Sequence, residues 1–213
     1  FGDIQVFSFH PCKNMTTAEG GCVVSRDEVV AKRLGHLRFF GIDRDAWNRY
    51  SKGGSQSLDV VEAGYKCNMS DLQASLGLEQ LKKLDGFCEA RRQLAMRYRT
   101  LLKDLPYITL PQDPSYDHVH GWHIFTALID TDAFGADREA FVEAMKEQNI
   151  GLGIHYPAVH LFTYYRETFG FNAGDFPVAE EVGRRIVSLP LYPSLTHTEQ
   201  DRVVMAIKRV FKK

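Results

Sequence analysis

Apolar and polar residues alternate near the start of the chain, and this pattern predicts a β-strand. Phe7 and Phe9 fall on one face of the strand, and Val6, Ser8 and His10 fall on the other. We expect the two phenylalanines to enter a hydrophobic core while Ser8 and His10 face a cleft.

A turn is predicted directly after this strand. Pro11 ends regular pairing because it has no N–H to donate, and Lys13 follows it. Gly20 and Gly21 allow a second turn, since glycine adopts backbone angles that other residues resist. Residues 22–25 then predict the next strand, so Lys13 is expected between two strands.

Apolar residues at helical spacing predict two helices in the middle of the chain. The first covers about residues 26–40, with Ser25 and Glu28 as a capping-box pair at its start. The second begins after Ser70 and continues as one long helix over residues 71–104, with a kink marked by Gly86. Its charged side carries both signs, which indicates a solvated face rather than a nucleic-acid patch.

The last hundred residues alternate between strand and helix patterns, which indicates a small α/β domain. Thr196 and Glu199 form a capping box before the last helix. Before this helix, we expect strands at residues 123–129 and 151–156 and helices at residues 137–148 and 177–185. Between the two helices predicted at 26–40 and 71–104, residues 43–59 are polar and glycine-rich, and we interpret them as a long surface loop in which Trp47 and Tyr50 contact a ligand, an interface or each other.

Composition narrows the function classes. The 213 residues are 44% hydrophobic and 25% charged with a net charge of −1, so no general attraction to nucleic acid or to anionic membranes is implied. No apolar run reaches membrane-spanning length. The four cysteines form no C-x-x-C pair, so we expect free thiols, no metal site and a cytoplasmic location; they are Cys12, Cys22, Cys67 and Cys88.

Lys13 is the main candidate for covalent chemistry. A lysine held between two strands and partly desolvated has a lowered pKa, so its lone pair is available to attack a carbonyl group. The ordinary alternative is a solvated charge in a turn, because lysine side chains are mostly exposed.

The run SFHPCKNMTTAEGG at residues 8–21 resembles the Schiff-base lysine segment of the DegT/StrS sugar-nucleotide aminotransferases. Residues 64–74, 153–157 and 188–193 resemble three later segments of the same family. This resemblance implies an α/β protein of the fold type I class that depends on pyridoxal 5′-phosphate (PLP). It covers the C-terminal half of the family, so we expect a fragment without the N-terminal half.

The resemblance also implies a domain division and a set of roles near the cofactor. Residues 1–70 would be the remainder of the PLP-binding large domain, 71–104 a connecting helix, and 105–213 the small C-terminal α/β domain. Lys13 would form the Schiff base with PLP and carry protons between the substrate and the cofactor. Ser8 would bind the cofactor phosphate, and His10 would line the same side of the ring unless it is a strand histidine bonded to a neighbour.

Lys66 and Asn68 would reach the phosphate of the cofactor in the partner subunit, which implies a homodimer with shared active sites. The commonest family form has asparagine and arginine at these two positions, so this chain departs at both, although lysine still serves a phosphate as a point charge. The Lys/Asn form and the segment at residues 41–49 resemble the branch that makes UDP-4-amino-4-deoxy-arabinose from a 4-keto pentose.

The implied substrates are glutamate, which becomes 2-oxoglutarate, and a nucleotide-linked 4-keto sugar. His155 and Tyr156 would face the sugar nucleotide or the glutamate carboxylate. Products of this family serve cell-surface polysaccharides or lipid A modification. The carboxylate that holds the pyridine nitrogen lies upstream of Phe1 in the family, so the fragment alone is expected to be inactive.

Two alternatives stay open. A PLP-dependent sugar dehydratase has the same fold, but members of that branch carry histidine at the position of Lys13. The other alternative is a catalytically incomplete fragment that acts only as a binding or oligomerisation module.

Overall fold

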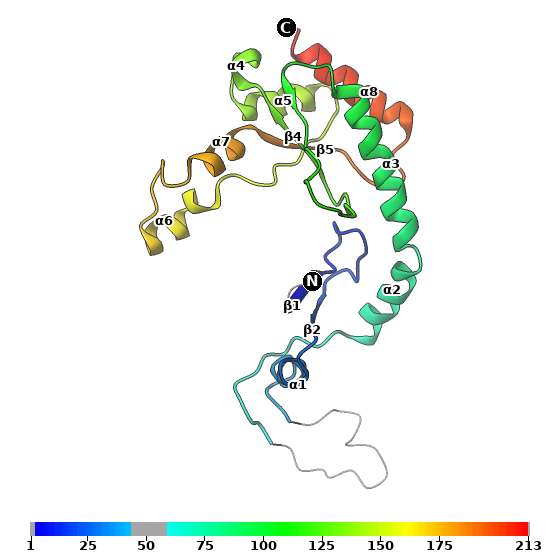
Figure 1. Cartoon of the computed structure of the whole chain (residues 1–213), viewed down its shortest axis with the longest axis vertical. Helices are drawn as coiled ribbons and strands as arrows, with labels where there is room; N and C mark the ends of the chain where they lie inside the picture. Colours follow the sequence, from blue (N-terminus) through cyan, green and yellow to red (C-terminus); the bar gives the residue numbers. More distant parts are fainter. Residues whose placement is uncertain (1–2, 44–58, 213) are drawn as a thin grey trace. The chain divides into compact units, whose positions relative to one another are not determined.

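The computed structural model describes residues 3–43 and 59–212 (Figure 1). The loop segment 44–58, with Trp47, Tyr50 and most of the 41–49 segment, lies outside the described residues. The chain forms two compact units, Phe1–Leu84 and Asp85–Lys213.

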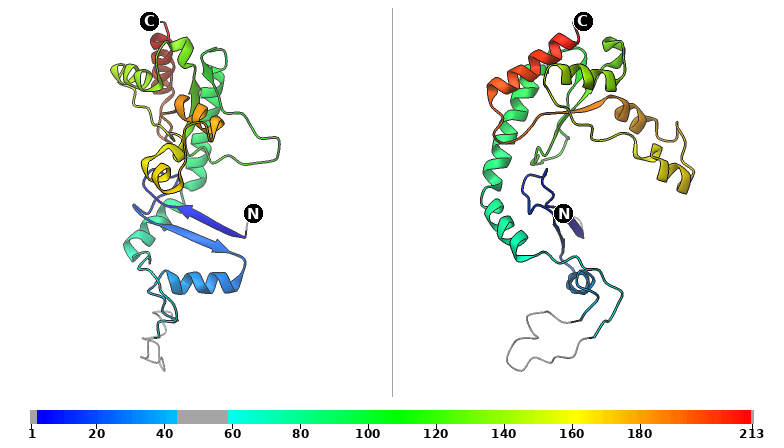
Figure 2. Two further views of the ribbon diagram at one scale, coloured as in Figure 1. Left: turned by 90° about the vertical axis from the view of Figure 1, so that its left-hand side faces the viewer. Right: turned by 180° about the vertical axis from the view of Figure 1, so that it is seen from behind.

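The first unit contains an antiparallel hairpin. Strand β1 (Ile4–Ser8) pairs with β2 (Gly21–Ser25), and Ser8 lies opposite Gly21 at the end that leads to Lys13 (Figure 2). The predicted strand therefore ends two residues before His10. Phe7 is 48% exposed and Phe9 is partly buried, so the expectation that both enter a core is wrong for Phe7. A two-stranded sheet cannot by itself cover both faces.

Helix α1 (Glu28–Leu37) follows β2 and begins later than predicted. Its N-cap is Asp27, whose carboxylate accepts the N–H groups of Val29 at 2.8 Å and Val30 at 3.3 Å. The predicted capping box of Ser25 and Glu28 is therefore wrong. Ser25 Oγ instead accepts the N–H of Asp27, because an aspartate two residues on offers the helix a better-placed cap.

The predicted long helix is two helices, α2 (Asp71–Leu81) and α3 (Leu84–Leu102). Ser70 caps α2 as expected, in a capping box with Gln73. The interruption lies at residues 82–83 rather than at Gly86, which is inside α3. The N–H of Lys83 bonds to the Gln80 carbonyl at 3.0 Å, and such a three-residue step tightens the last turn and ends the α-helix.

The second unit is built on a three-stranded antiparallel sheet in the order β3–β4–β5. Its strands are β3 (Ile108–Thr109), β4 (Phe125–Ile129) and β5 (Ile186–Leu189). The predicted strand at residues 151–156 is wrong, since only Gly153 forms a β-bridge there, with Ser188 of β5. That bridge nevertheless attaches the segment to the free edge of β5.

Helices surround this sheet in the second unit. Three of the predicted helices are confirmed, including the N-cap Asp137 and the capping box of Thr196 with Glu199. The short helices around residues 159–169 were not predicted. The elements are α4 (Thr131–Phe134), α5 (Arg138–Glu147), the 3₁₀ helix η2 (Val159–Leu161), α6 (Thr163–Phe169), α7 (Pro177–Arg185) and α8 (His197–Val210).

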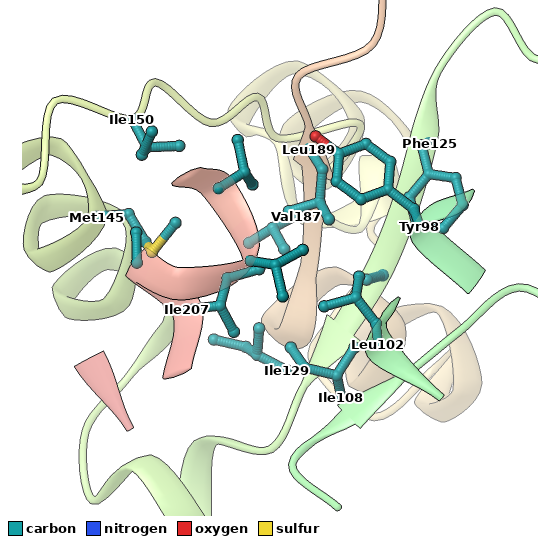
Figure 3. Close-up of a cluster of buried hydrophobic side chains, with 14 of the residues drawn as sticks. Tyr98, Leu102, Ile108, Phe125, Ile129, Met145, Ile150, Val187, Leu189 and Ile207 are labelled. Carbon is teal, nitrogen blue, oxygen red and sulfur yellow. The ribbon is translucent and has the colours of Figure 1, made fainter. Parts of the chain in front are cut away.

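The hydrophobic core of the second unit lies between the sheet and helices α3, α5 and α8 (Figure 3). Tyr98, Phe125, Ile129, Met145 and Ile207 are fully buried in it. Helices α3 and α8 lie side by side in Figures 1 and 2. The buried Gln200 of α8 donates to the Leu94 carbonyl of α3 at 2.7 Å. No helix of the described residues is long and apolar enough to cross a membrane.

Candidate active site

Lys13 lies in a closed loop between β1 and β2. The N–H of Phe9 donates to the Gly20 carbonyl at 2.8 Å, and the N–H of Thr17 donates to the Phe9 carbonyl at 3.0 Å. Thr16 Oγ1 donates to the same Phe9 carbonyl at 2.9 Å. These bonds join the two ends of the loop. Lys13 lies within the loop and is partly buried.

A tight turn at the far side of the loop holds the backbone of Lys13. Its N–H donates to the His10 carbonyl at 2.9 Å, with Pro11 inside the turn. Because proline fixes its own φ, the chain has few other conformations at this point. The loop therefore fixes the backbone from which the Lys13 side chain extends, and a fixed backbone favours a covalent link to a cofactor.

Thr17 fixes the loop to helix α2. Its side chain is 1% exposed, and its hydroxyl donates to the Glu19 carbonyl at 2.8 Å. Gly77 of α2 faces it so closely that a Cβ there would lie 2.9 Å from Thr17 Cγ2. At Gly20, with φ of +152°, a Cβ would lie 2.4 Å from Thr17 Oγ1, so the turn needs glycine on both counts.

Gln73 adds a polar link between the same two elements. Its Oε1 accepts the N–H of Ser70 at 2.9 Å and so caps α2, while its Nε2 donates to the Glu19 carbonyl at 2.8 Å. One side chain therefore orders the helix start and the lysine loop together. The sequence suggested Gln73 only as part of a resembling segment and gave it no role.

Ser8 and His10 precede Lys13 at the end of β1 and have local hydrogen bonds of their own. Ser8 Oγ accepts the N–H of His10 at 3.4 Å. The Nδ1 atom of His10 accepts the N–H of Cys12 at 3.2 Å and lies 3.1 Å from its thiol, while Nε2 is 3.9 Å from a Glu19 carboxylate oxygen. A hydroxyl, an imidazole and an amine thus follow one another at the end of β1.

Lys66 and Asn68 lie on the segment that leads into α2. The ammonium group of Lys66 is 4.3 Å from the ring centroid of Phe39 and 5.0 Å from that of Phe40, which is a cation–π arrangement. A β-bridge between Phe39 and Lys66 fixes the backbone there. Asn68 is exposed, and the methyl group of its neighbour Met69 would lie 3.2 Å from a Cβ at Gly20.

His155 and Tyr156 belong to the second unit. His155 is partly buried, its Nδ1 lies 2.8 Å from Ser188 Oγ, and its ring meets the Tyr156 ring edge-on at 5.0 Å. Tyr156 is 65% exposed. Sequence reasoning missed Ser188, although this residue opens the segment at 188–193 that carries part of the resemblance.

Comparison with known proteins identifies the family. The sequence pattern of the DegT/DnrJ/EryC1/StrS aminotransferase family matches residues 1–208. This chain belongs to that family.

Relatives match nearly all of the chain but only half of their own length. An uncharacterized protein of Methanocaldococcus jannaschii is 43% identical over 210 residues, covering 98% of this chain and 54% of the relative. The spore coat polysaccharide biosynthesis protein SpsC of Bacillus subtilis is 40% identical over 212 residues, covering 99% and 54%. The chain therefore spans about half the length of the curated relatives that it matches.

The solved structure of a putative sugar aminotransferase confirms the predicted fold class. The putative sugar aminotransferase Spr1654 from Streptococcus pneumoniae, in its PMP form, has a TM-score of 0.87 and 29% identity over 99% of this chain and 53% of its own. A PLP form of the same protein also matches, with a TM-score of 0.85. The family's aminotransferases use PLP, and the present chain matches about half of the fold type I architecture.

The residues at the end of β1 fit two ends of PLP. Lys13 offers an amine for its aldehyde carbon, and the Ser8 hydroxyl offers a donor for its phosphate. Ser8 ends β1 and Lys13 lies in the closed loop that follows, so both groups belong to one short stretch of the family segment. Glu19, whose side chain is 73% exposed, faces His10 instead of offering a buried carboxylate for a pyridine nitrogen.

We expect Gly77→Ala to loosen the loop that holds Lys13. The added Cβ must displace the buried Thr17, and overpacking of this kind costs about 1–3 kcal/mol. If the cost falls on local opening, the amides of Phe9 and Thr17 will exchange with solvent roughly 5- to 150-fold faster. Hydrogen exchange on the complete protein measures this directly.

Gly35→Ala is the matched control, because Gly35 is also helical and nothing lies within 4 Å of the added Cβ. It should leave exchange at Phe9 and Thr17 unchanged while strengthening α1. Equal exchange in the two variants would show that Gly77 does not support the loop.

Proposed function

We propose that the complete protein transfers the amino group of glutamate to a nucleotide-linked 4-keto sugar and uses PLP to do so. The observation that carries the proposal is the hydrogen-bonded loop that holds Lys13 inside the family segment. The relative named for spore coat polysaccharide biosynthesis supports a role for the product in a cell-surface polysaccharide.

Lys13 is the catalytic residue of this proposal. PLP, when bound, supplies an electron sink for charge that develops at the α-carbon of the amino donor. Lys13 Nζ would hold the cofactor covalently until the amino group of glutamate takes its place and frees the lysine amine. The freed Nζ would then accept the proton from the α-carbon of glutamate and, with the keto sugar bound, deliver a proton to the sugar carbon that receives the amino group. The Ser8 hydroxyl donates to the cofactor phosphate, and His10 lines the same side of the ring.

His155 and Tyr156 are the proposed contacts to the second substrate or to the glutamate carboxylate. The imidazole is fixed through Ser188, and the largely exposed Tyr156 offers a hydroxyl and an aromatic face. Both features suit a sugar nucleotide, which carries hydroxyl groups, phosphates and a base.

Lys13 also favours aminotransfer over the two open alternatives. The dehydratase branch carries histidine at this position, so a lysine favours aminotransfer. A non-catalytic module has no need for a lysine loop closed by backbone bonds and tied to α2, whereas a covalent catalyst does.

We expect Lys13→Ala to abolish aminotransfer by the complete protein while leaving its fold intact, because no other amine takes the place of the covalent link. Borohydride reduction of the wild-type protein with PLP should fix the cofactor on the peptide that contains Lys13. Lys32→Ala is the control, since Lys32 is a solvated lysine of the same unit with a side chain 72% exposed. Label on another lysine would reject the assignment.

A homodimer with shared sites is the second part of the proposal. Lys66 and Asn68 precede α2 on an exposed segment, and the Lys66 ammonium packs against two aromatic rings while remaining a point charge for a phosphate.

We expect a protein with Lys66→Ala and Asn68→Ala to be inactive alone. Mixed with the Lys13→Ala protein, it should regain activity, since one of the two sites in each heterodimer is then complete and about half of the wild-type rate per dimer is available. Verified heterodimers without any recovery would count against sharing.

The proposed sugar is a UDP-linked 4-keto pentose. A pocket discriminates against one extra hydroxymethyl group by only about 10- to 200-fold, so relative kcat/KM is the quantity to compare. We expect the complete protein to prefer UDP-linked 4-keto pentoses over UDP- and dTDP-linked 4-keto hexoses when 2-oxoglutarate formation is followed. A dTDP-hexose turned over well above every UDP-pentose would reject the pentose and keep the aminotransferase. Failure of every keto sugar, with cofactor bound to Lys13, would reject the reaction itself.

A further inference from the structure

Ser188 has backbone partners on both sides, although β5 is an edge strand of the three-stranded sheet. It lies opposite Thr126 of β4 on one side of β5, and Gly153 bridges to it on the other. Its N–H donates to the Gly153 carbonyl at 2.8 Å, and its carbonyl accepts the N–H of Gly153 at 3.0 Å. Two neighbouring strands thus fix the backbone of Ser188, and only 5% of the residue is exposed.

The ring of His155 folds back onto this hydroxyl. Its Nδ1 lies 2.8 Å from Ser188 Oγ. The ring occupies the space above Gly153, where an added Cβ would lie 2.6 Å from His155 Cε1 and 3.1 Å from Nδ1. Glycine at residue 153 is therefore a condition for the contact between His155 and Ser188.

The direction of this hydrogen bond follows from burial. In the described part of the chain, His155 Nδ1 is the one hydrogen-bond partner of the Ser188 hydroxyl. If Nδ1 carried the proton, the buried O–H would have no acceptor. A buried donor without a hydrogen bond destabilises the folded state. A hydroxyl that donates to Nδ1 satisfies both groups and leaves the ring proton on Nε2.

We propose that Ser188 is a positioning residue that holds His155 with its Nε2–H available as a donor to an anionic oxygen of the substrate. This rests on the proposed function, in which His155 contacts a substrate. The ligand chemistry is a carboxylate or phosphate oxygen, since an N–H donor of fixed direction recognises either. The carboxylate would come from glutamate and the phosphate from the sugar nucleotide.

The kinetic test compares Ser188→Ala, Gly153→Ala and Thr126→Val in the complete protein. The first variant removes the hydroxyl, and the second keeps it but pushes the ring away. Each should raise the KM of one substrate about three- to tenfold with kcat nearly unchanged, because the loss of one hydrogen bond weakens binding by about that factor. Thr126→Val is the matched control, because it removes a hydroxyl from the residue opposite Ser188 and keeps the side-chain shape.

The two sources of anionic oxygen are separated by which KM rises. A higher KM for glutamate assigns the carboxylate, and a higher KM for a UDP-linked 4-keto sugar assigns the diphosphate. Unchanged KM values for both substrates in Ser188→Ala, or an equal rise in Thr126→Val, would overturn the proposal.

A second readout does not depend on turnover. In protein labelled with ¹⁵N-histidine, the His155 signals, identified with His155→Gln, should show a bare Nδ1 and a protonated Nε2. Ser188→Ala should shift this distribution, and Ser188→Thr, which keeps the hydroxyl, should restore it. A protonated Nδ1 in the wild type overturns the proposal whether or not aminotransfer is observed. Loss of the proposed function alone would instead appear as an inactive wild type with the expected tautomer.

Discussion

The closure of the loop between Phe9 and Gly20 is the constraint on which the candidate active site depends. Two backbone hydrogen bonds and one from a threonine hydroxyl join the ends of the loop. These local bonds offset the entropy cost of ordering the loop, so cofactor binding does not have to offset it. Thr17 and Gln73 then fasten the closed loop to α2. The segment with Lys66 and Asn68 leads into that same helix, so α2 supports both the Lys13 loop and the segment proposed to reach the cofactor of the partner subunit.

The second unit uses a different support for its candidate residues. Helix α3 holds the segment after β5, because the Tyr98 hydroxyl donates to the Pro190 carbonyl at 3.0 Å and Arg91 Nη1 donates to the Leu191 carbonyl at 2.9 Å. Burial raises the pKa of the Tyr98 phenol, so this donor stays protonated throughout the neutral range. The position of Ser188 therefore follows from the core, and His155 is oriented by a residue that the core has fixed.

Much of the local structure was predictable because the signals are local. Ser70, Asp137 and Thr196 cap helices as expected, since capping depends on residues within one turn. The predictions that were wrong concern competition and long-range pairing. Asp27 replaced Ser25 as a cap, residues 82–83 ended a helix whose apolar pattern continues, and the predicted strand at 151–156 became the single bridge at Gly153.

The candidate site divides in the same way. Ser8, His10 and Lys13 follow one another along one strand end and its turn, so their proximity was visible in the spacing. Ser188 is 33 residues from His155, and only the pairing of Gly153 with β5 brings the two together. Whether a polar side chain acts on a substrate or on another side chain depends on such tertiary pairing. A family segment therefore points to the candidate lysine, but the residues that orient the proposed substrate contacts follow from how the sheet edge is completed.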